Sequence, residues 1–76
     1  MNHKNCSKYM GMATINEVSY ALHHCNGERL WVSRVGNDVP IYEATISQVK
    51  KMLWGKPYGL LEKTMRAAYN LFIALP

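Results

Sequence analysis

Histidine and cysteine side chains gather where His23, His24 and Cys25 follow one another in the sequence. Both residue types bind zinc, and His3 and Cys6 upstream are the remaining candidates for a ligand set. Zinc ligands must converge, however, and neighbouring residues of a strand point to opposite faces of the sheet. At most His23 and Cys25 share a face, so we expect no metal site.

The sequence also lacks the patterns of common catalytic sites. A nucleophilic Cys25 beside a histidine would need an aligned base and an oxyanion-binding loop, and neither is indicated. The segment Gly-Lys-Pro-Tyr-Gly at 55–59 lacks the spacing and the preceding strand of a phosphate-binding loop. The carboxylates are scattered: Glu17, Glu28, Asp38, Glu43 and Glu62.

The length of the chain points the same way. Its 76 residues make one small domain, and a small-molecule pocket of roughly 300–1,000 Å³ would take up much of the interior. We therefore expect a protein that is not an enzyme, has no catalytic residues and needs no cofactor. A protein that works with its outer surface, alone or as a homodimer, fits this size better.

Positive charge is concentrated late in the sequence, where residues 50–66 carry the net charge of +4 found for the whole chain. The cations are Lys50, Lys51, Lys56, Lys63 and Arg66. With Trp31, Trp54 and Tyr58 to stack on bases, they could bind nucleic acid. They could equally meet an acidic protein or form a solvated helix face, with Trp54 closing the core and Tyr58 capping a helix.

We expect a cytoplasmic protein, in a host cell if the chain is phage-encoded. The first ten residues lack the apolar region of a signal peptide, and no apolar run approaches the ~18 residues of a membrane span. A disulfide bond between Cys6 and Cys25 is disfavoured, because Cys6 falls in a stretch expected to be a loose tail.

The elements that position these residues begin after a polar tail at 1–12. Residues 13–25 alternate like a strand, and Asn26-Gly27 is a strong hairpin signal. A second strand follows over 29–35, with Leu30 and Val32 on one face and Trp31 and Ser33 on the other. Gly36-Asn37-Asp38 marks a turn, residues 39–44 read as a third strand, and residues 7–13 could add a fourth.

Two helices should follow. Thr45 and Gln48 have the spacing of a capping box, and apolar residues then recur at helical intervals until Gly55, which we expect to end the helix in a left-handed conformation. A second helix begins near residues 58–60, with Leu61 and Met65 at the start of its apolar stripe. Residues 13–76 are thus an α+β domain: a three- to four-stranded antiparallel meander with both helices packed on one face.

This order of features resembles the small type I-F anti-CRISPR proteins of phages. The shared features are the Asn26-Gly27 hairpin, the segment "SQVKKMLWG", the corner "KPYG" and the segment "LLEKTMRAAYN". The resemblance implies a non-enzymatic inhibitor that sits on the backbone subunits of the crRNA-guided surveillance complex and stops target DNA from pairing with the guide. It also implies a binding surface on the sheet, with an aromatic residue just before the hairpin turn.

The sequence departs from that group at two positions. His24 stands where the group has the aromatic residue, and Val35 and Gly36 stand where it has an acidic one. We expect a protein partner, within a ribonucleoprotein complex, to be bound through five hairpin residues: Tyr20, His24, Arg29, Trp31 and Arg34. The alternative is a basic nucleic-acid-binding or regulatory domain that uses Lys50, Lys51 and Lys56. A homodimer through the open sheet face or an edge strand is a third alternative.

Overall fold

A computed structural model describes residues 7–55 and 59–75 of the chain. It contains four strands, β1 (Ser7–Ile15), β2 (Val18–Cys25), β3 (Arg29–Arg34) and β4 (Tyr42–Thr45), followed by helices α1 (Ile46–Met52) and α2 (Leu60–Ile73). The strands form one antiparallel sheet in the order β1-β2-β3-β4. The predicted α+β meander is confirmed, with four strands.

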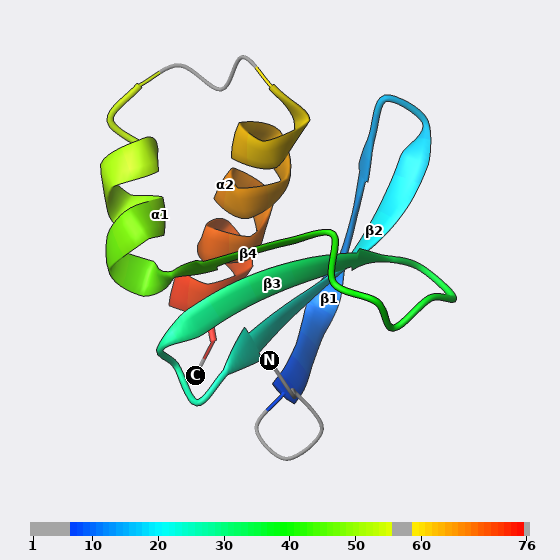
Figure 1. Cartoon of the computed structure of the whole chain (residues 1–76), viewed down its shortest axis with the longest axis horizontal. Helices are drawn as coiled ribbons and strands as arrows, with labels where there is room; N and C mark the ends of the chain where they lie inside the picture. The colour runs from blue at the N-terminus through cyan, green and yellow to red at the C-terminus, as the bar shows by residue number, and fades with distance from the viewer. Residues whose placement is uncertain (1–6, 56–58, 76) are drawn as a thin grey trace.

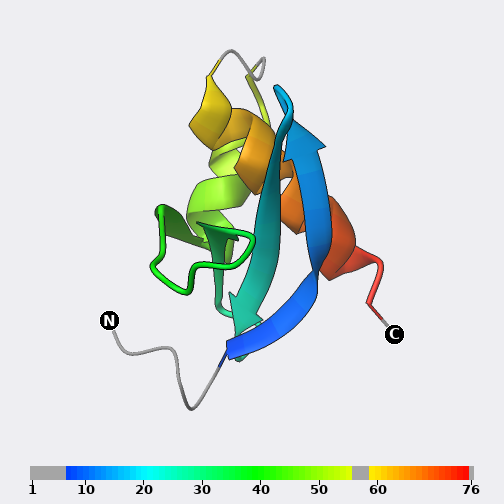
Figure 2. The same cartoon turned by 90° about the vertical axis from the view of Figure 1, so that its right-hand side faces the viewer.

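The two helices lie side by side (Figure 1), and α2 passes behind β1 and β2 when the molecule is turned by 90° (Figure 2). Both therefore cover the same face of the sheet, as the sequence predicts. The core between the helices and the sheet is apolar. It includes Leu22, Leu30 and Val32 from the sheet and Val49 and Met65 from the helices, all fully buried.

The hairpin between β1 and β2 was missed by the expectation of one continuous strand over 13–25. Asn16 and Glu17 both have positive φ, 53° and 69°, which is the backbone of a two-residue type I′ turn. Ile15 pairs with Val18 on either side of this turn. Asparagine tolerates positive φ, but glutamate does not favour it, so the sequence carries only half of the usual signal.

The same hairpin shows that the prediction of a tail over residues 1–12 is wrong for its second half. Residues 7–12 belong to β1, which confirms the fourth strand and overturns the tail for this part of it; residues 1–6 lie outside the described residues. The pairing of β1 with β2 shifts between Tyr9 and Gly11, so Met10 is a β-bulge residue. Its side chain packs against the core.

The bulge decides which side chains share a face of β1. Tyr9 pairs with His23, and Met12 pairs with Ala21. His23 and Ala21 are two residues apart on β2 and point to the same side of the sheet. Tyr9 and Met12, three residues apart, would point to opposite sides of a regular strand, and the extra residue brings them to one side.

The other predicted turns and the first helix follow the sequence closely. Asn26 and Gly27 have positive φ, and the capping box of α1 is complete: Gln48 N donates to Thr45 Oγ1 and Thr45 N donates to Gln48 Oε1. The end of α1 differs from expectation. Leu53 is the C-cap in right-handed helical geometry, and Gly55 does not have positive φ.

Candidate functional site

One row of side chains crosses all four strands on the face of the sheet that the helices leave uncovered. The register pairs Tyr9 with His23, His23 with Trp31, and Trp31 with Glu43. We call these four residues the aromatic row. Because residues paired directly across strands project from the same face, the row forms one continuous strip. Strand alternation then defines the whole face, here called the outer face: Ser7, Tyr9, Met12, Thr14, Ser19, Ala21, His23, Cys25, Arg29, Trp31, Ser33, Glu43 and Thr45.

The rings of the aromatic row contact one another in sequence. His23 stacks on Trp31 with ring centroids 3.8 Å apart and planes 10° from parallel. Tyr9 contacts His23 edge-on, with ring centroids 5.6 Å apart and ring planes at 63°. Both geometries are favourable for aromatic pairs, so the three rings hold one another in place.

Hydrogen bonds fix the middle of the row. Trp31 Nε1 donates to Ser7 Oγ at 3.1 Å, and His23 Nε2 lies 3.3 Å from Ser33 Oγ. Trp31 is only 4% exposed and Ser33 is fully buried. The row therefore has a rigid base formed by the buried Trp31 and the half-buried His23, and an accessible end formed by Tyr9.

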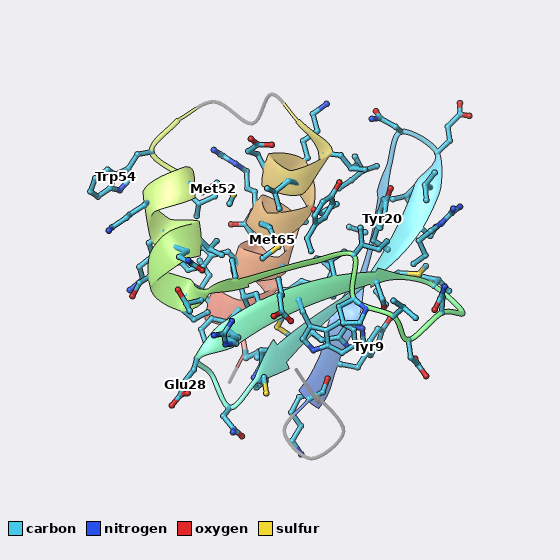
Figure 3. All side chains as sticks on the ribbon, in the orientation of Figure 1. Tyr9, Tyr20, Glu28, Met52, Trp54 and Met65 are labelled. Carbon is cyan, nitrogen blue, oxygen red and sulfur yellow. The ribbon has the colours of Figure 1, made fainter. Side chains whose placement is uncertain are left out.

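The accessible part of the outer face is nearly neutral and combines an apolar pair with the exposed polar residues Thr14 and Glu43. Tyr9 is 62% exposed and Met12 is 59% exposed, and the bulge places them side by side. Within the described strands, the face carries one cation, Arg29, and one carboxylate, Glu43, which lie 3.9 Å apart. Figure 3 shows Tyr9 beside the group of stacked rings and well away from Met65, which marks the core.

The structure separates the five hairpin residues predicted to form the site. Trp31 and Arg29 lie on the outer face, but Trp31 is buried there. Tyr20 and His24 lie on the opposite face, because Tyr20 pairs with Arg34 and His24 pairs with Leu30, a core residue. Tyr20 is only 5% exposed and belongs to the core, and Arg34 is exposed at the end of β3.

His24 therefore has a structural role. Its Nδ1 accepts a hydrogen bond from Gly27 N at 3.2 Å, and its ring meets Phe72 of α2 edge-on at 5.5 Å. The prediction that His24 joins Trp31 in one surface is wrong. Its neighbour His23 occupies that surface, since adjacent residues of a strand point to opposite faces.

The basic residues predicted to bind nucleic acid also differ in their surroundings. Lys50 and Lys51 are exposed on the last turn of α1, as predicted, and Lys56 lies outside the described residues. Arg66 instead packs against the end of α1, where its Nη2 donates to Leu53 O at 3.5 Å and to Gly55 O at 3.2 Å. Trp54, which we expected either to stack on bases or to close the core, is 87% exposed.

Those residues considered for metal binding or catalysis that the structure describes do not converge on a metal site. Among residues 7–55 and 59–75, no group of three or more histidine, cysteine, aspartate or glutamate side chains is placed to hold a metal ion. Cys25 forms a disulfide bond, contrary to expectation; Cys6 lies outside the described residues.

A shallow hollow of about 380 Å³ between β1 and α2 is lined by Ala13, Thr14, Ile15, Lys63, Arg66, Ala67 and Asn70.

Sequence reasoning missed Tyr9, Met12, His23 and Glu43. Tyr9 and Met12 were assigned to a tail, with a fourth strand over 7–13 as the alternative, and the signal of Asn16 for a turn would have favoured the strand. In the described part of the chain, neither helix has the length and hydropathy needed to cross a membrane. No protein-family model, curated protein sequence or solved structure matches the chain.

Proposed function

We propose that the protein binds another protein through the outer face of its sheet and has no catalytic activity of its own. The aromatic row and its exposed end carry this proposal. Protein interfaces use tyrosine and tryptophan anchors that are held rigidly, because little conformational entropy is then lost on binding. Tyr9 is such an anchor, exposed and held by His23 over a buried Trp31.

Charge favours a protein partner for this face. A surface that binds phosphates needs several unpaired cations. The described strands place one arginine on this face, and it lies near a carboxylate. Tyr9 and Met12 offer an apolar centre, and Arg29 and Glu43 offer a polar rim. This combination is typical of protein interfaces.

The resemblance to type I-F anti-CRISPR proteins gives the proposal its most specific form. We propose that the partner is a protein subunit of the crRNA-guided surveillance complex and that the bound protein blocks access of target DNA. The outer face supports a sheet-side surface of the kind found in that group, with Tyr9 as its exposed aromatic residue in place of His24.

The test is a competition experiment with purified type I-F surveillance complex. The complex is incubated with the protein, and retention of a labelled target duplex is then measured by gel shift. We expect the wild-type protein to abolish retention and Tyr9→Ala to be at least tenfold less potent. Tyr42→Ala, a half-buried residue of the opposite face, is the matched control for loss of a tyrosine.

Two results would contradict the proposal. Undiminished DNA retention at a large excess of wild-type protein would exclude the surveillance complex as the partner. Equal potency of Tyr9→Ala and wild type would move the interface away from the outer face. Sedimentation of the free protein checks whether a second copy of the chain occupies this face instead: we expect a monomer, and a dimer that Tyr9→Ala dissociates would replace the proposed partner.

A further inference from the structure

Trp54 is the most exposed large apolar side chain in the described part of the chain, at 87%. It follows α1 directly, and Trp54 N donates to Lys51 O at 3.3 Å, which continues the helical path by one further turn. Figure 3 shows its ring projecting outward from the end of α1, on a different side of the molecule from Tyr9. This side chain makes no contribution to the aromatic row.

Two lysines flank the exposed ring. Lys50 and Lys51 are four and three residues before Trp54, respectively, the spacing that places side chains on neighbouring positions of a helix surface. Both are exposed, and neither forms an ion pair with any other described residue. Their ammonium groups are therefore available to an anionic ligand.

Arg66 adds a third positive charge at the same end of α1. The C-terminal end of a helix carries partial negative charge on its free carbonyl groups, which repels anions. The guanidinium of Arg66 donates to two carbonyl oxygens just beyond this end, on Leu53 and Gly55. It thereby offsets part of the negative charge that the helix dipole places beside Trp54.

We infer that Trp54, Lys50 and Lys51 form a binding surface for single-stranded nucleic acid, in which a base stacks on the indole and the lysines contact flanking phosphates. A flat exposed ring with unpaired cations on one side is the arrangement that single-strand-binding proteins use. The bases of a duplex are already stacked, so a duplex offers no free base face to Trp54.

A protein partner suits this surface less well than it suits the outer face. A tryptophan anchor in a protein interface is surrounded by other groups that exclude water. Lys50, Lys51 and Gly55, which lie near Trp54 in the sequence, are all exposed. Stacking on a base needs no such surround, because one ring face is enough.

The inference is tested by tryptophan fluorescence with a 20-nucleotide oligo-dT. Trp31 is buried and Trp54 is exposed, so quenching by stacking reports on Trp54. We expect quenching that saturates at low salt, disappears in Trp54→Leu and weakens at least tenfold in the double variant Lys50→Glu, Lys51→Glu. Lys63→Glu, a single charge reversal at an exposed site of α2, is compared with Lys51→Glu alone and should have less than a third of its effect. Anisotropy of a labelled oligo-dT gives the same affinities without relying on tryptophan.

Three outcomes would overturn the inference. Oligo-dT binding that is unchanged in Trp54→Leu by anisotropy would leave only non-specific charge attraction. Equal affinity for oligo-dT and for a duplex of the same length would exclude base stacking. Equal or tighter binding of a poly-glutamate peptide of matched charge would assign the surface to an acidic protein.

Discussion

The two tryptophans of this chain have opposite surroundings. Trp31 is buried in the sheet, stacked on His23 and hydrogen-bonded to Ser7, whereas Trp54 projects into solvent beside two lysines. The indole of Trp31 stabilises a rigid surface but is not accessible to a partner, whereas the indole of Trp54 is accessible. The exposure of an aromatic side chain and the contacts that hold it, more than its residue type, therefore decide whether it can contact a partner.

Truncation of the two tryptophans should separate these roles most strongly. Trp31→Ala removes a buried ring and one hydrogen bond, and we expect a loss of about 3–5 kcal/mol in the free energy of unfolding. Trp54→Ala should change it by less than about 0.5 kcal/mol, as for most surface positions. Urea denaturation followed by circular dichroism measures both.

Trp31→Phe provides the graded comparison, and it replaces Trp31→Ala if that variant does not fold. It keeps a ring for His23 but loses the bond to Ser7, and we expect a loss of about 1–2 kcal/mol. Equal stability of the Trp31 and Trp54 variants would contradict the contrast between the two sites.

Two glycines, Gly11 in β1 and Gly55 after α1, extend the comparison between the sheet and the end of α1. Gly11 follows the bulge with φ of 151°, and an added Cβ would lie 3.1 Å from Leu71 Cδ1. We expect Gly11→Ala to cost roughly 1–3 kcal/mol and to weaken partner binding by Tyr9, since the bulge orients that side chain. Gly55→Ala is the control: its added Cβ would have only Met52 O nearby, at 3.9 Å.

Thermal unfolding of the two glycine variants measures the loss of stability that each substitution causes. A smaller loss in Gly11→Ala than in Gly55→Ala would show that the bulge is not constrained in the way its geometry indicates, and would remove the reason given for Tyr9 and Met12 sharing a face.

The smallest of these effects concerns Arg66 at the end of α1. Arg66→Met keeps an apolar stem but removes the donors to Leu53 O and Gly55 O, and we expect a loss of about 1 kcal/mol. Lys63→Met on the same helix has no described partner to lose and should stay within about 0.5 kcal/mol. Identical urea midpoints for the two variants would show that Arg66 does not hold the end of α1.

Much of the fold was predictable because local signals agree with the tertiary structure. Three such signals have a known physical basis: the Asn26-Gly27 turn, the Thr45 capping box and the alternation of Leu30, Trp31 and Val32. The Asn16-Glu17 turn was not predictable in the same way, because Glu17 adopts positive φ without the usual glycine. Without that turn, β1, which contains Tyr9, was predicted only as an alternative to a tail.

The candidate site was predicted only in part for a related reason. Pairing partners depend on register, and an error of one residue transfers a side chain to the other face. His24 was chosen for its place before the turn, but its pairing with Leu30 directs it to the helices. The exposure of Trp54 could not be read from composition, since a small domain ordinarily buries its large aromatic residues.

The assignment of two partners to two surfaces is tested most directly by a crossed measurement of four affinities. Tyr9→Ala and Trp54→Leu are each titrated against purified surveillance complex and against oligo-dT. We predict that Tyr9→Ala weakens binding to the complex at least tenfold and leaves oligo-dT affinity within threefold of wild type, whereas Trp54→Leu does the reverse. If both variants lose the same ligand, the two surfaces do not have separate partners. If Tyr9→Ala binds the complex as tightly as wild type, the outer face is not the protein-binding surface.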